Sequence, residues 1–177
     1  MNFRLPSAAF AALALAALAG CASMGNPGAV AELAPTAAIS PNPTIGKVTF
    51  TPLDHGLRVA GEVRGLAPNS EHGFHIHEKG DCGDNGNASG GHFNPAGGIH
   101  GKFAAPGSHA GELPSLVADA SGVARFRVDD HSISLTDGAA NNVLGRALVV
   151  HRDRDDFTTQ PAGNSGPRIA CAVISKG

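Results

Sequence analysis

Two histidines stand one residue apart in the segment GFHIHEKGDC, which runs from Gly73 to Cys82. In a β-strand, residues i and i+2 point to the same face of the sheet, so His75 and His77 are expected to lie side by side. Paired imidazoles suit a metal that takes nitrogen ligands. The alternative is a pair of hydrogen-bonded surface histidines, so this spacing alone predicts a candidate metal site and no more.

More residues with metal-binding side chains follow. His92, His100 and His109 lie on one long stretch and are followed by Glu112, and His151 ends the apolar run ALVVH. A loop that supplies three nitrogens and a carboxylate could close a four-coordinate zinc site. Histidines from two strands could hold copper in tetragonal nitrogen geometry. An imidazole that has lost both protons can contact two metals through its two ring nitrogens.

Short strands are the elements that must position these side chains. The chain has 24 Gly, 12 Pro, no Trp and no Tyr, a composition typical of a turn-rich all-β protein. No amphipathic helix of useful length is evident. Two long irregular stretches, 78–114 and 152–168, are expected to be functional loops. Period-two alternation between turn signals predicts strands at 45–51, 57–63, 73–77, 123–128, 132–135, 147–151 and 169–174.

Net charge and the N-terminus limit the partners. The formal net charge is −2 and no basic patch is present, so nucleic acid is not expected as a partner. Residues 1–20 read as a signal peptide whose apolar core is too short to span a bilayer. The sequence LAGC at its end resembles the bacterial lipoprotein signal, with Cys21 as the lipidated residue. An ordinary secretory signal with an incidental cysteine is the alternative.

Residues 21–40 are small and rich in Ala and Pro, and they are expected to form a flexible tether. The folded domain is then expected over 41–177. Ala22 after the cysteine favours sorting to the outer membrane, so the expected location is the periplasm with a lipid anchor there.

Two cysteines remain, Cys82 and Cys171, and in an oxidising compartment they are expected to pair. Such a disulfide would stabilise the fold by about 4–5 kcal/mol on the chain-entropy model; free buried thiols are the alternative.

The motifs GFHIHE, GDC, GGHFNP, LVVH and GNSGPRIACAVI occur in this order between residues 45 and 177. Together they resemble the copper–zinc superoxide dismutase family in its bacterial, exported form. The resemblance implies a flattened Greek-key β-barrel or sandwich of about eight antiparallel strands with two long functional loops. It also implies copper and zinc as cofactors, superoxide as the substrate, and dismutation to dioxygen and hydrogen peroxide as a protection of the periplasm.

The resemblance further implies a role for each matching residue. His92 would bridge copper and zinc and carry a proton during turnover, and Arg168 would attract the anionic substrate. Asp155 would hydrogen-bond one copper-ligand and one zinc-ligand histidine, and Cys82 and Cys171 match the family's disulfide. The implied copper ligands are His75, His77, His92 and His151, and the implied zinc ligands are His92, His100, His109 and Glu112.

Two positions depart from the family's usual pattern. Glu112 stands where the family normally has Asp, which places zinc affinity in question. Ala162 stands where many members have a Thr that narrows the substrate channel. Two alternatives therefore remain open at this point: a copper-only superoxide dismutase, and a periplasmic copper-buffering lipoprotein without turnover. The family includes monomers and homodimers, and the sequence favours neither.

Overall fold

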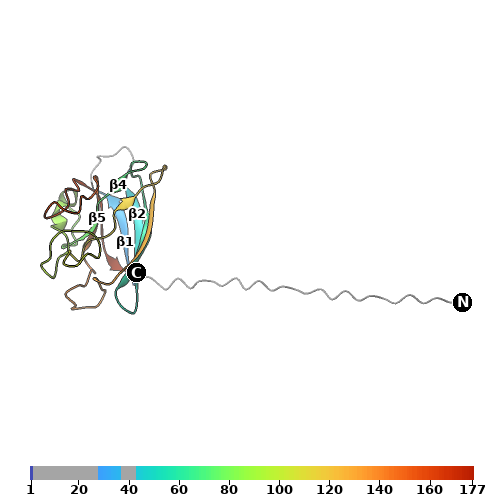
Figure 1. The fold of residues 1–177 in the computed structure, drawn as a ribbon, viewed down its shortest axis with the longest axis horizontal. Coiled ribbons are helices and arrows are strands. Elements are labelled where there is room, and N and C mark those ends of the chain that lie inside the picture. The colour runs from blue at the N-terminus through green and yellow to red at the C-terminus, as the bar shows by residue number, and fades with distance from the viewer. Residues whose placement is uncertain (2–27, 37–42) are drawn as a thin grey trace.

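The structure is a computed structural model that describes residues 1, 28–36 and 43–177 (Figure 1). The predicted signal peptide after residue 1, the predicted lipidation site at Cys21 and both ends of the predicted tether lie outside these residues. Among the described residues, no helix has the length and apolar character needed to cross a membrane.

One antiparallel sheet of eight strands dominates the fold. Its strand order is β5-β8-β9-β1-β2-β3-β7, with β10 paired to β1. Because this path ends at β5 and β7, the sheet is a curled half-barrel, and the prediction of an all-β fold with about eight antiparallel strands is confirmed. The strands are β1 (Ala29–Pro35), β2 (Ile45–Pro52), β3 (Leu57–Arg64), β5 (Phe74–His77), β7 (Ala124–Asp130), β8 (Ala147–His151), β9 (Arg168–Val173) and β10 (Ser175–Lys176).

Three small elements lie outside this sheet. Two two-residue strands, β4 (Glu71–His72) and β6 (Leu116–Val117), pair with each other, and a 3-10 helix, η1, spans Asp84–Ser89. The two long stretches expected to be loops carry few other elements, and they fold against the sheet beside β5 and β8. The disulfide between Cys82 and Cys171 ties the first of these loops to β9.

The prediction of a flexible tether over 21–40 is wrong for Ala29–Pro35, because this segment forms β1. It pairs with β2 along its length and with β9 near its end. Ala29, Ala31 and Leu33 are buried, whereas Glu32 is exposed, so the alternation of a half-buried strand is present. Most of the buried positions in this alternation are alanines. Because alanine is only weakly apolar, the pattern does not distinguish a strand from an Ala-rich linker. The folded part therefore includes β1 and does not begin at residue 41.

The predicted strand at 132–135 is also wrong, because only an isolated bridge between Ser134 and Asn142 forms there. The Ser132 backbone N–H and hydroxyl both donate to Oδ1 of Asp130, at 2.8 and 2.6 Å. This local turn ends β7 and redirects the chain, as Asp side chains commonly do. Ile133 is nevertheless fully buried, which explains the strand-like apolar signal.

The core lies inside the curl of the sheet. Phe74 and Ile76 of β5 contribute to it, and the Phe74 ring packs edge-on against Phe126 with centroids 5.1 Å apart. On the same strand, His75 and His77 point to the opposite face, where the long loops cover them. All four residues are buried. A strand between a core and a covering loop thus holds its histidines away from water.

Candidate metal centre

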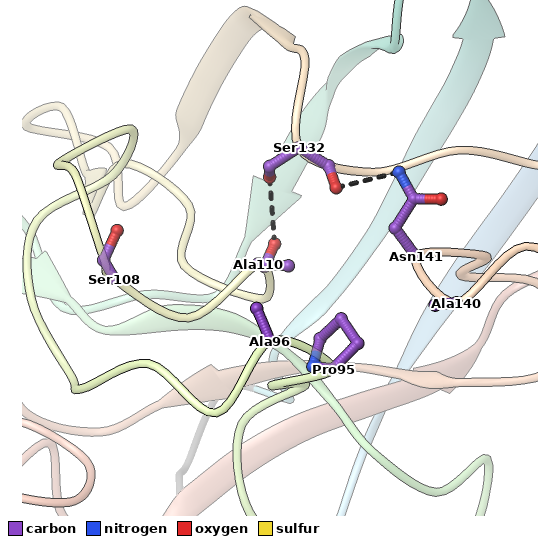
Figure 2. A pocket seen from close by; sticks show the side chains of 7 residues that line it. All are labelled: Pro95, Ala96, Ser108, Ala110, Ser132, Ala140 and Asn141. Carbon is purple, nitrogen blue, oxygen red and sulfur yellow. Dashed lines mark hydrogen bonds between the residues drawn. The ribbon is translucent and has the colours of Figure 1, made fainter.

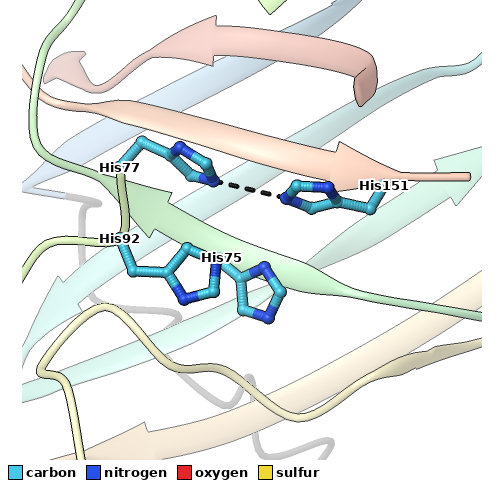
Figure 3. Close-up of side chains that lie close together, drawn as sticks. All are labelled: His75, His77, His92 and His151. Atoms are coloured by element: carbon cyan, nitrogen blue, oxygen red, sulfur yellow. Dashed lines mark hydrogen bonds between the residues drawn. The ribbon is translucent and has the colours of Figure 1, made fainter. Parts of the chain in front are cut away.

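Two neighbouring strands and a loop bring the first group of histidines together. His75 and His77 come from β5, His151 ends the adjacent strand β8, and His92 comes from the covering loop (Figure 3). Their candidate ligand atoms all lie within 4.8 Å of one another, and all four residues are buried. The Nε2 atoms of His77 and His151 are 3.3 Å apart, and the rings of His75 and His92 stack with centroids 3.9 Å apart.

A second group lies beside the first and consists of His92, His100, His109 and Glu112. Oε1 of Glu112 stands 3.1 Å from Nδ1 of His92, 2.9 Å from Nδ1 of His100 and 2.8 Å from Nδ1 of His109. Three nitrogens and one carboxylate from one loop are a donor set that zinc accepts. His109 and Glu112 also line a cavity of about 390 Å³.

Main-chain hydrogen bonds fix the loop on β5. The N–H of Phe93 donates to Ile76 and the N–H of Ile76 donates to Gly111, both at 2.8 Å. These contacts set His92 opposite His77 and Glu112 opposite His75. The loop thus pairs with β5 at the metal-binding end of that strand. This pairing brings His92 and Glu112 close to the histidines of β5.

His92 belongs to both groups. Its Nδ1 faces Glu112 in the second group, whereas its Nε2 is buried among the first group and has no hydrogen-bond partner within residues 28–36 and 43–177. One imidazole with its two nitrogens in two ligand sets can contact two metals at once. The arrangement therefore fits a pair of metals that share one histidine.

Asp155 connects the two groups by a second route. Its Oδ2 accepts a hydrogen bond from Nε2 of His75 at 2.7 Å, and its Oδ1 accepts one from Nε2 of His100 at 2.9 Å. Asp155 is 3% exposed, so water does not weaken these bonds. A carboxylate that holds the Nε2 proton leaves Nδ1 of each imidazole free to bind a metal.

Several buried polar atoms have no hydrogen-bond partner among the described residues. They include Nδ1 of His75, Nε2 of His92 and Oε2 of Glu112, and Nδ1 of His109 also lacks a hydrogen bond of acceptable geometry. Leaving such groups unpaired costs about 1–3 kcal/mol each. Metal ions would satisfy the unpaired nitrogens, so the residues fit the two metals that their chemistry suggests.

The protonation states also favour metal binding. Burial, together with the neighbouring histidines, holds the pKa of His75 and of His77 well below the ordinary histidine value. Burial likewise lowers the pKa of His151 to about 4, although a hydrogen bond to the Gly166 carbonyl opposes the change. Burial raises the pKa of Glu112, but the nearby histidines outweigh it and the net change is downward. Neutral imidazoles and an ionised carboxylate are the forms that bind metals.

Arg168, at the start of β9, is held beside the first group. Its guanidinium donates to the Gly86 carbonyl, to Oγ of Ser89 at 2.8 Å and to the Gly90 carbonyl at 2.7 Å. The Gly90 carbonyl also accepts a hydrogen bond from Nδ1 of His77 at 2.9 Å. Burial lowers the Arg168 pKa from its high ordinary value, but guanidinium stays charged at neutral pH. A fixed cation thus lies next to His77.

The structure brings together all the predicted metal-binding residues, Asp155 and Arg168; Cys21 lies outside the described residues. The sequence did not point to Gly163, whose positive φ of 63° lets the 152–168 loop fold back against its own Asp155 and against His100. Nor did it point to Ser89 or to the Gly86 and Gly90 carbonyls, which hold Arg168. Only the repeated glycines in these loops could have indicated such close approaches.

A second cavity lies apart from these groups (Figure 2). Its volume is about 330 Å³, and its lining is mostly apolar, with Pro95, Ala96 and Ala110 among the lining residues. Asn141 and Ser132 close one side, where Nδ2 of Asn141 donates to the Ser132 carbonyl at 3.0 Å. None of the clustered histidines lines this cavity, so it takes no part in the metal centre.

Comparisons with known proteins agree with this site. The family described as Copper/zinc superoxide dismutase (SODC) matches residues 44–174. Superoxide dismutase [Cu-Zn] 2 of Aquifex aeolicus (strain VF5) is 40% identical over 134 residues, which cover 73% of this chain and 78% of that protein. Extracellular superoxide dismutase [Cu-Zn] of Haemonchus contortus is 38% identical over 141 residues, 76% of this chain and 75% of that protein. The crystal structure of the clock protein EA4 superposes with a TM-score of 0.74 at 34% identity, covering 85% of this chain and 96% of that one.

Proposed function

The chain belongs to the copper/zinc superoxide dismutase family, and on that premise we propose which of its residues carry the reaction and where in the cell it occurs. As a member of this family it is an enzyme that converts superoxide to dioxygen and hydrogen peroxide with copper and zinc. The observation that carries the proposal is the position of His92, which supplies one nitrogen to each of two buried ligand groups.

The first group, His75, His77, His92 and His151, is proposed to bind copper. Four imidazole nitrogens on two strands and a loop suit the tetragonal preference of copper(II). The second group, His92, His100, His109 and Glu112, is proposed to bind zinc, which accepts three nitrogens and a carboxylate. Support for Glu112 comes from its Oε1 atom, which lies within 3.1 Å of all three Nδ1 atoms.

When bound, copper supplies the one-electron chemistry that oxidises one superoxide and reduces the next, and zinc supplies a fixed positive charge. Arg168 attracts the superoxide anion toward the first group, because its guanidinium is held there by three acceptors. When Nε2 of His92 is not bound to copper, it would hold a proton and pass it to the reduced substrate. Asp155 keeps His75 and His100 in the tautomer that leaves Nδ1 free.

The enzyme is proposed to act outside the cytoplasm of a bacterium, in the periplasm. The signal-like residues 1–20 and the lipoprotein-like Cys21 support export and a lipid anchor on the outer membrane. The disulfide between Cys82 and Cys171 is typical of an oxidising compartment. Labelling with a radioactive fatty acid and cell fractionation test this directly, because Cys21→Ala should abolish the label and release the protein as a soluble form.

The ligand assignment is tested by metal analysis and copper(II) EPR of the purified chain and of His92→Ala. The intact chain should hold one copper and one zinc, and removal of zinc should change the EPR spectrum. In His92→Ala the copper spectrum should no longer respond to zinc. A zinc content near zero in the intact chain would favour a copper-only enzyme, and metal binding without turnover would favour a copper-buffering protein.

A further inference from the structure

Glu112 has one oxygen that the zinc site does not use. Oε1 lies among the three Nδ1 atoms of the second group, whereas Oε2 is buried and has no hydrogen-bond partner in the part of the chain that the structure describes. The residue is only 2% exposed, so solvent does not satisfy this second oxygen. A buried, charged oxygen without a partner is unfavourable, and its surroundings therefore need an explanation.

A histidine of the other ligand group lies close to this oxygen. Oε2 of Glu112 lies 3.6 Å from Nε2 of His75, a proposed copper ligand. The main chain sets this approach, because Glu112 and His75 are bridge partners and the N–H of Ile76 bonds the carbonyl of Gly111. A shift of under about 1 Å would bring the pair within hydrogen-bond distance.

Asp155 already accepts the Nε2 proton of His75, at 2.7 Å. Two carboxylates therefore face the same N–H group, and the ligand atoms of His75, Glu112 and Asp155 lie within 4.8 Å of one another. Each carboxylate has its other oxygen on a histidine of the zinc group. Both carboxylates thus lie between the two ligand groups, with Glu112 at Nδ1 of His100 and Asp155 at its Nε2.

We propose that Glu112 is a second positioning residue for His75, which links the zinc site to the copper site in parallel with Asp155 and His92. The inference rests on the ligand sets proposed above. With Oε1 fixed by zinc, Oε2 shares the Nε2 proton of His75. This favours the tautomer of His75 that presents Nδ1 to copper, and it raises the basicity of Nδ1. An aspartate is one methylene shorter and would not reach both places from this backbone position.

A double-mutant cycle on the full-length, zinc-loaded chain tests the link. The variants are Asp155→Ala, Glu112→Asp and the pair, and the readout is the copper(II) dissociation constant from competition with a chelator. Asp155→Ala should weaken copper binding more in the Glu112→Asp background than in the original chain, by a factor of about 3 or more. Because the cavity left by alanine is the same in both backgrounds, it cancels in this comparison. An equal loss in both backgrounds would overturn the inference.

Proton NMR of the copper(I), zinc-loaded form gives a second readout that does not depend on zinc binding by Glu112→Asp. In Asp155→Ala, the Nε2–H resonance of His75 should remain protected from exchange with water, because Glu112 still accepts it. The exposed His55 ring serves as the freely exchanging reference. A His75 resonance in Asp155→Ala that exchanges as fast as that of His55 would show that Glu112 does not hold the proton.

Metal content and superoxide decay of the original chain are measured alongside. If the original chain fails to bind one copper and one zinc, the ligand assignment itself is wrong. If it binds both and is active while the cycle is additive, only the role of Glu112 is overturned.

Discussion

A side chain at position 163 would collide with Oδ1 of Asp155, so Gly163 lies in direct backbone contact with the carboxylate that joins the two ligand groups. Its φ of 63° is itself a conformation that other residues adopt at a cost. The backbone at Gly163 therefore packs against Asp155 of the same loop and limits where that carboxylate can lie.

Gly163→Ala should displace Asp155 from His100 and weaken zinc binding by about 10- to 100-fold, the usual cost of losing a partner of a metal ligand. Gly138→Ala is the matched control, since Gly138 also has a positive φ but no atom lies within 4 Å of the position of its Cβ. Both variants should lose about 1–3 kcal/mol of stability through backbone strain. Equal zinc affinity in the two variants would contradict the proposed contact.

Arg168→Gln should lower the rate of superoxide decay by about tenfold or more and should flatten its dependence on salt, because steering of an anion by a fixed cation is screened by ions. Arg127→Gln changes the net charge equally at an exposed position on β7 and should leave the rate nearly unchanged. Stopped-flow decay at several ionic strengths compares the two. Equal rate losses would show that total charge matters and that the place of Arg168 does not.

Removal of β1 should prevent stable folding. A chain that begins at residue 41 lacks the strand between β2 and β9 and leaves both of their edges unpaired. A chain that begins at residue 22 keeps β1 and should unfold cooperatively with heat, as followed by circular dichroism. Cooperative unfolding of the chain that begins at residue 41 would show that β1 is dispensable.

The metal-free chain should lose stability as the pH falls from about 6.5 toward 4. Burial lowers the pKa of His151 to about 4, against about 6.5 in the unfolded chain, so the unfolded state takes up a proton first. By pH 4.5 this histidine alone should cost roughly 2–3 kcal/mol. Urea unfolding at pH 7 and pH 4.5 measures the loss, which should be smaller in His151→Gln. An identical loss in both chains would exclude this contribution.

The other titratable groups of the site change the stability of the folded state in acid in opposite directions. Burial lowers the pKa of His100, but hydrogen bonds and charges from Asp155 and Glu112 raise it overall, so this residue favours the folded state in acid. His75 and His77 have lowered pKa values and act in the same direction as His151. Comparison with His151→Gln therefore isolates one residue from this mixture.

The sequence predicts the parts of this protein that depend on local pattern. Alternation in period two predicts β2, β3, β5, β7, β8 and β9, and the i, i+2 rule places His75 and His77 on one face. β1 was missed because alanine carries its inward positions and gives a weak apolar signal. The strand predicted at 132–135 does not form. Its apolar residue, Ile133, lies in a turn that the Asp130 carboxylate stabilises.

Contacts between distant segments could not be predicted from local pattern. The approach of Glu112 to His75 depends on how the loop pairs with β5, a register that only the folded chain sets. The motifs implied which residues would bind metal, but not that the longer side chain of Glu112 would leave an oxygen facing His75. Gly163 comes close to Asp155 because the 152–168 loop folds back on itself, a conformation that local sequence pattern does not specify.

The most direct test of this metal centre is superoxide decay in the presence of the full-length chain loaded with copper and zinc, beside the same amount of free copper and beside His92→Ala. We expect fast decay that cyanide suppresses and that His92→Ala loses. Decay no faster than with free copper, in a chain shown to contain both metals, would contradict the assignment of this site as a superoxide dismutase centre.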